Sequence, residues 1–88
     1  MDTTKFINKE MALMAATTAY IAAVNTGHFA QLNGPNVCDD FTLDVYLHPD
    51  ELFTLPSGYV YSGIEEQICK PEPKEYRPFK IKMYIFKF

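Results

Sequence analysis

A long stretch without formal charge near the start of the chain constrains the fold more than any other feature. The sequence EMALMAATTAYIAAVNTGH begins at Glu10, and the next charged side chain after this glutamate is Asp39. Apolar residues recur in it at helical spacing, and alanine, the best helix former, fills much of the remaining surface. Residues 2–4 offer capping oxygens, and Gly27 suits a left-handed C-terminal cap. We therefore predict a helix from about residue 5 to residue 26.

The predicted helix is apolar on nearly every side, which raises the question of what covers it. One stripe contains Phe6, Leu13, Thr17, Tyr20 and Val24, and its neighbour contains Ile7, Met11, Met14, Thr18 and Ile21. One thin sheet cannot cover so much apolar surface, and small alanine side chains allow a second helix to approach closely. We predict a protein interface, including one with a second copy of the chain, at Ala12, Ala16, Ala19 and Ala23. The alternative is a monomer with an exposed alanine flank.

This apolar stretch does not predict a membrane span or an export signal. Residues 11–24 would extend about 21 Å as a helix, which is short of a hydrocarbon core of about 30 Å. Glu10 adjoins the apolar region, and cleavage after Ala23 would place the bulky Ile21 where a signal peptide requires a small residue. We expect no membrane partner.

Strand patterns dominate the rest of the chain. Residues 41–47 and 79–88 alternate between apolar and polar or aromatic side chains, which is the period of a half-buried strand. The NGPN sequence at 33–36 predicts a loop, and we expect this loop to follow the helix directly. In an 88-residue chain, a long helix followed by strands predicts one α+β domain, with the helix packed on a small antiparallel sheet of three or four strands.

Three further segments carry weaker signals. HPDELF, at 48–53, favours a single helical turn because proline suits the first helical position. Residues 64–69 fit a strand or a short helix equally well. The three prolines within residues 70–78 predict an extended connection rather than a paired strand.

The polar residues form no recognisable catalytic or metal-binding motif. The candidate zinc ligands His28, Cys38, His48 and Cys69 lack the close spacing of a structural zinc site. The acidic residues between 39 and 50 lack the spacing and central glycine of a calcium loop. We expect no enzymatic activity, no metal and no cofactor. Two cysteines make no disulfide framework, so we predict reduced thiols and a cytoplasmic location.

Charge is distributed unevenly along the chain, although the net charge is only −3. Residues 10–69 carry −8 with no lysine or arginine, whereas residues 70–88 carry +4. A basic strand lying beside acidic strands in one sheet would explain this pattern. The alternative is a surface with one acidic and one basic region, which binds a basic partner or self-associates head to tail.

The C-terminal strand suggests two kinds of partner. Lys80, Lys82, Tyr84 and Phe86 share one strand face, and cations interleaved with aromatic rings could bind single-stranded nucleic acid. The low overall basic content makes nucleic acid the less favoured partner, and these lysines could instead protect a sheet edge while the rings pack on the helix. Tyr84, Phe86 and Phe88 could also extend the sheet of a partner protein.

Protein association is the function that these features favour. We predict a small non-enzymatic interaction module, an inhibitor or adaptor such as viruses encode, that binds another protein and self-associates through its N-terminal helix. The alternative is a single-stranded nucleic-acid-binding domain that uses the C-terminal strand.

Overall fold

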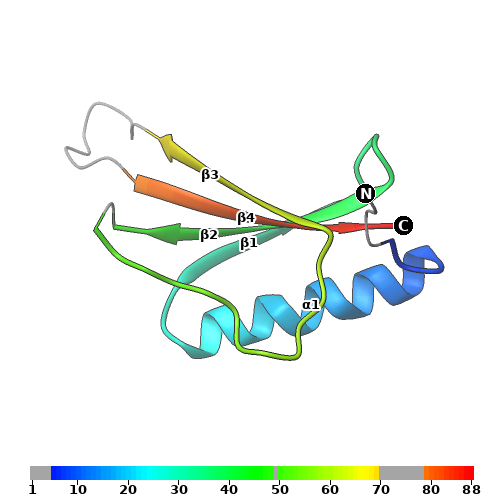
Figure 1. The fold of residues 1–88 in the computed structure, drawn as a ribbon, viewed down its shortest axis with the longest axis horizontal. Coiled ribbons are helices and arrows are strands. Elements are labelled where there is room, and N and C mark those ends of the chain that lie inside the picture. Colours follow the sequence, from blue (N-terminus) through cyan, green and yellow to red (C-terminus); the bar gives the residue numbers. More distant parts are fainter. Residues whose placement is uncertain (1–4, 49, 70–78) are drawn as a thin grey trace.

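One helix lies across one face of a four-stranded antiparallel sheet in the computed structural model, which describes residues 5–48, 50–69 and 79–88 (Figure 1). The sheet has the order β1-β2-β4-β3, and every neighbouring pair is antiparallel. This arrangement confirms the predicted α+β fold. The elements are α1 (Lys9–Asn25), β1 (Phe29–Asn33), β2 (Asp40–Leu47), β3 (Gly63–Cys69) and β4 (Phe79–Lys87).

The helix begins later than predicted and ends close to the predicted position. Asn8 caps its start, because the side-chain Oδ1 accepts a hydrogen bond of 2.9 Å from the backbone N–H of Met11. At the other end, Gly27 follows the capping residue Thr26. The φ angle of Gly27 is +88°, and the Gly27 N–H donates a hydrogen bond of 2.9 Å to the carbonyl of Val24. This left-handed conformation favours glycine and explains why the helix stops here.

The two central strands were predicted, whereas β1 was not. In β2 the apolar residues alternate as predicted, and Phe41, Leu43, Val45 and Leu47 are all buried. A strand, β1, occupies the position where a loop was expected, and of the NGPN sequence only residues 34–36 lie outside it. A Cβ on Gly34 would lie 2.6 Å from the Phe41 ring, so this turn requires glycine.

The structure also settles the ambiguous segments that it describes. Residues 64–69 belong to β3 and are therefore a strand, not a helix. The helical turn predicted at 48–53 is wrong for the described residues there, which form only a turn closed by the Glu51 N–H and the His48 carbonyl, 2.9 Å apart. The predicted proline-rich connection at 70–78 lies outside the described residues.

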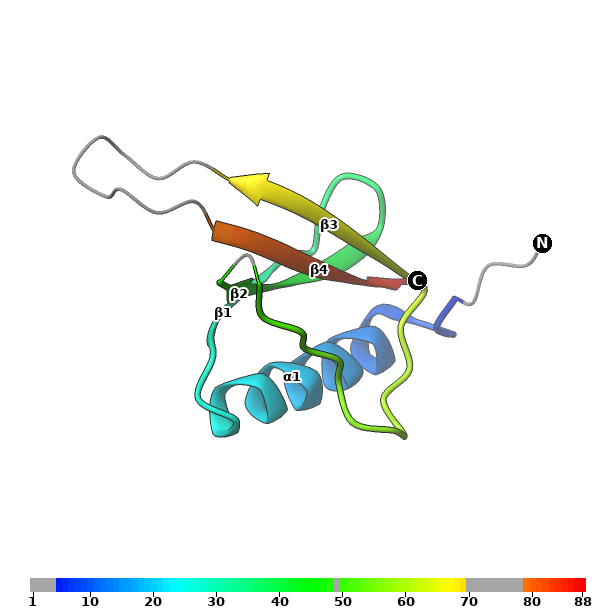
Figure 2. The same cartoon turned by 60° about the vertical axis from the view of Figure 1, so that its left-hand side comes forward.

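The core forms between the small residues of α1 and the large residues of the sheet (Figure 2). Tyr84 and Phe86 of β4 are fully buried beneath the helix together with the inward residues of β2. These bulky side chains leave room only for a helix whose contact side is small, because protein interiors are close-packed. The helix therefore contacts the sheet through Ala12, Ala16, Ala19 and Ala23, each with 0% exposure.

The second face of the sheet is covered by no helix or strand in the described ranges (Figure 2). The alternation of the strands places Phe29, Tyr46, Ile81, Met83 and Ile85 on this open face. No helix formed by the described residues is long and apolar enough to cross a membrane.

Candidate protein-interaction surface

From Met11 onward, the side of α1 that points away from the sheet carries large apolar residues and no charge. We call Met11, Met14, Thr18 and Ile21 the outer helix face, because their spacing places them on one side of the helix. Met14 is 68% exposed, Ile21 51% and Met11 45%. The sequence has no charged residue from Met11 to Asn25, so this face lacks the charged residues typical of a solvent-facing helix.

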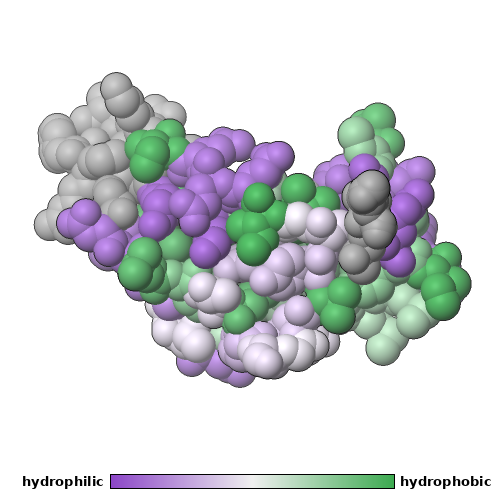
Figure 3. Space-filling view, viewed as in Figure 1, coloured by the Kyte–Doolittle hydropathy of each residue, from purple (hydrophilic) through white to green (hydrophobic). Residues whose placement is uncertain are grey.

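A groove runs beside the outer helix face. Residues 58–60 form its opposite wall, and its volume is about 360 Å³. In Figure 3, hydrophobic atoms gather at the N-terminal end of α1, while hydrophilic atoms cover much of the region around β3. The groove therefore extends the apolar surface of the helix onto the neighbouring segment. Its lining residues are Phe6, Met11, Met14, Ala15, Thr18, Gly58, Tyr59 and Val60.

The structure corrects the predicted alanine interface. Ala12, Ala16, Ala19 and Ala23 are fully buried against the sheet, so no partner can reach them in this fold. The sequence argument assumed that large residues of the helix face the core and that small ones remain outside. The aromatic side chains of β4 reverse this order, because they fill the space that large helix residues would need. This aromatic content was the signal that could have identified the buried side.

The predicted interface residues of β4 are also placed differently from expectation. Tyr84 and Phe86 are fully buried, and the Tyr84 ring lies 4.9 Å from the Tyr61 ring. Burial raises the pKa of the Tyr84 phenol. Phe88 is half-buried, with its ring 5.7 Å from that of Phe41. These rings pack in the core rather than forming an accessible patch, which corrects the prediction for Tyr84 and Phe86.

The predicted nucleic-acid residues do not form an exposed face. Lys80 Nζ donates to the carbonyl of Glu51 at 2.8 Å, and Lys82 Nζ donates to the carbonyl of Phe53 at 2.7 Å. Lys82 Nζ also lies 3.5 Å from Glu66 Oε2. The lysines thus hold the segment after β2 against the sheet, and Tyr84 and Phe86 lie in the core. The ion pair supports the intramolecular explanation of the uneven charge distribution.

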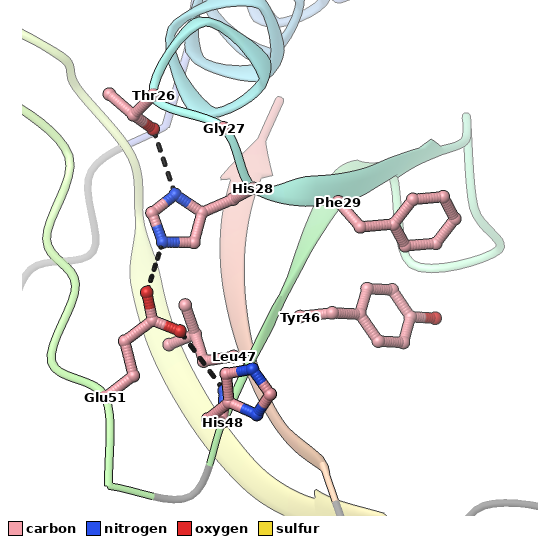
Figure 4. Close-up of a pocket in the computed structure, with 8 residues that line it drawn as sticks. All are labelled: Thr26, Gly27, His28, Phe29, Tyr46, Leu47, His48 and Glu51. Carbon is pink, nitrogen blue, oxygen red and sulfur yellow. Dashed lines mark hydrogen bonds and ion pairs between the residues drawn. The ribbon is translucent and has the colours of Figure 1, made fainter. Parts of the chain in front are cut away.

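A second polar cluster links the C-terminal end of α1 to the segment after β2 (Figure 4). Both ring nitrogens of His28 are engaged: Nδ1 lies 3.0 Å from Thr26 Oγ1, and Nε2 lies 2.7 Å from Glu51 Oε2. Glu51 Oε1 accepts a hydrogen bond of 3.2 Å from the His48 N–H. The bond from His28, and then that from His48, lower the pKa of the Glu51 carboxyl.

This cluster has the composition of a catalytic triad but not its chemistry. The Thr26 hydroxyl lies 2.8 Å from the Ala23 carbonyl, to which it donates at the helix C-terminus. The partial negative charge of that end opposes formation of an alkoxide. The neighbouring pocket of about 580 Å³ also contains Phe29 and Tyr46, but their rings point away from His28 and Glu51 (Figure 4). We interpret the cluster as a structural clasp.

Other candidate ligands are not assembled into a metal site. Within the described residues, no group of three or more His, Cys, Asp or Glu side chains is placed to hold a metal ion. Cys38 is an exposed free thiol.

Neither family models, nor curated proteins, nor solved structures give a significant match to this chain. The chemistry of the surface itself therefore supports a functional proposal.

Proposed function

We propose that this protein is a small non-enzymatic interaction module, an inhibitor or adaptor, that binds another protein surface through the outer helix face. The same face mediates self-association. The observation that carries this proposal is the uncharged, apolar outer side of α1, where Met14 and Ile21 remain more than half exposed.

Burial of the outer helix face, together with the adjacent groove, would favour association. Complete burial of one Met or Ile side chain contributes about 1.5–3 kcal/mol. Met14 and Ile21 are 68% and 51% exposed, so burying the exposed part of both side chains contributes roughly 2–3.5 kcal/mol. An apolar helix seated along the face and in the groove would bury the other lining residues as well, which is a recurrent mode of peptide recognition.

Self-association favours an antiparallel arrangement of two α1 helices. The outer helix face carries no charge, so two copies do not repel each other when their faces meet. An antiparallel pair also places the positive end of one helix dipole beside the negative end of the other. Thr18, which lies between the larger Met14 and Ile21, allows the two backbones to approach.

Replacing Met14 with glutamate tests this proposal. The Met14→Glu variant keeps a good helix former at an exposed site, so it retains the fold. Burial of its carboxylate at a helix interface is unfavourable, and dimerisation weakens by at least about tenfold. Light scattering over a concentration series measures the effect, and circular dichroism checks the fold.

Val37→Glu is the matched control, because it also replaces an apolar side chain with glutamate, at a 99% exposed site in the turn between β1 and β2. This control keeps the mass of the wild type. A wild type that remains monomeric at high concentration would contradict self-association. An unchanged mass for Met14→Glu in a dimerising protein would place the interface elsewhere.

A further inference from the structure

Strand β3 lies at an edge of the sheet and is not covered by the helix (Figures 1 and 2). In the described part of the chain, α1 contacts β1, β2 and β4 but not β3. Ile64 and Ile68 point to the helix side of the sheet, yet they are 44% and 63% exposed because α1 does not extend over them. The strand therefore presents apolar side chains next to a backbone edge.

The backbone of β3 is suited to accept another strand. It pairs with β4 without interruption from Gly63 opposite Ile85 to Cys69 opposite Phe79. An edge strand directs alternate N–H and C=O groups outward, and proteins usually protect such edges with proline, charged side chains (especially lysine) or a bulge. The sequence of β3, GIEEQIC, contains neither proline nor lysine, and its pairing has no bulge.

The charge of this edge is negative on both sides of the sheet. Glu65 and Glu66 are adjacent in β3, so their side chains point to opposite faces. Glu66 lies 3.5 Å from Lys82 but remains 49% exposed, so its charge is only partly neutralised. Glu65 lies opposite Met83, and no ion pair is present for it within the described residues.

We propose that β3 binds an extended segment of a partner protein that carries two adjacent basic residues flanked by apolar ones. Added as a new strand, this segment places one cation beside Glu65 on the open face and the other beside Glu66 on the helix side. Its apolar residues then pack beside Ile64 and Ile68. Backbone bonds supply affinity and the side-chain pairs supply selectivity. This surface is independent of the outer helix face.

A second copy of the chain is a poor occupant of this edge. Antiparallel pairing of β3 with itself places glutamates opposite or diagonal to glutamates, and like charges at these positions are unfavourable. The other edge strand, β1, has the sequence FAQLN and offers no cation. A basic segment of another protein places cations beside the carboxylates of β3. Neither edge strand of this sheet, β1 or β3, supplies such cations.

Three synthetic peptides test this proposal. The first alternates valine and threonine around a central pair of lysines, and the second has glutamates in place of the lysines. The third is the lysine peptide N-methylated at the amides that would bond to β3. Titration is followed by NMR of the 15N-labelled wild-type protein at low salt. The lysine peptide shifts the amides of β3, whereas the glutamate and N-methylated peptides bind at least about fivefold more weakly.

Single charge reversals supply the matched comparison. Glu65→Lys weakens binding of the lysine peptide by about fivefold or more, whereas Glu10→Lys, an equal change at an exposed site on α1, does not. Met14→Glu also leaves this binding intact, which separates the result from that for the outer helix face. Equal affinity for lysine and glutamate peptides, equal binding of the N-methylated peptide, or no shifts at β3 up to about 5 mM peptide would overturn the proposal.

Discussion

At the scale of single residues, the small side chains of α1 determine how closely the helix approaches the sheet. Ala16 is fully buried, so Ala16→Leu must insert a larger side chain into a filled core. We expect a loss of about 1–3 kcal/mol of unfolding free energy for this change. Met14→Leu, at a 68% exposed site, is the control and remains near neutral. Urea unfolding measures both, and an Ala16→Leu variant as stable as the wild type would contradict the buried placement.

The partly buried carboxylate of Asp44 destabilises the folded state. Its Oδ2 accepts a bond of 3.3 Å from Asn33, while its buried Oδ1 has no hydrogen-bond partner within the described residues. Desolvation raises the pKa of this carboxyl above its ordinary value, although the Asn33 bond acts in the opposite direction. The folded state therefore binds the Asp44 proton more tightly than the unfolded state does, and Asp44 disfavours folding increasingly as the pH rises through the folded-state pKa.

Asp44→Asn removes this cost. We expect the variant to be more stable than the wild type at neutral pH by about 0.5 kcal/mol, a value reduced for the partial exposure of the side chain. The difference disappears below the unfolded-state pKa of about 3.9, where the carboxyl is protonated in both states. Glu65→Gln, on the same sheet face, serves as the control. Unfolding curves at several pH values measure the effect, and a variant less stable at neutral pH would contradict it.

At the scale of elements, the clasp of Thr26, His28 and Glu51 fastens the segment after β2 to the end of α1. The lowered pKa of Glu51 means that its stabilising contribution is present above the unfolded-state pKa and is lost as the pH falls through the folded-state pKa. Glu51→Gln should therefore lower Tm at neutral pH, and the two proteins should converge in acid. Glu65→Gln, at an exposed site on β3, should leave Tm unchanged. A constant difference between wild type and Glu51→Gln at all pH values would contradict this assignment.

The elements differ in how well the sequence predicts them. The strands β2 and β4 were predicted because each has enough residues to display its period, as in the alternating burial of Phe41 to Leu47. The helix was predicted from its apolar, alanine-rich composition and its capping residues. Strand β1 was missed because FAQLN is short and directly follows a helix cap. The buried side of α1 was also missed, because apolar residues surround the helix and tertiary packing alone selects the alanine side. The predicted interface was therefore assigned to the side of α1 that the structure buries against the sheet.

At the scale of the whole molecule, one helix and one connecting segment cover only part of the sheet. The outer helix face, the open sheet face and the β3 edge are all left without cover by the described part of the chain. Of these, the outer helix face is uncharged, whereas β3 is acidic. The two surfaces therefore suit different partners, one apolar and one basic.

Isotope-filtered NMR tests the central proposal, that the outer helix face is the association surface, most directly. Equal amounts of 13C-labelled and unlabelled protein are mixed at a concentration where dimers form. Intermolecular contacts are then detected from the methyl groups of the labelled copy. We expect contacts between Met14 and Ile21 methyls of one copy and the outer helix face of the other. Contacts confined to Ile81, Met83 and Ile85 of the open sheet face, or the absence of dimers at any concentration, would contradict the proposal.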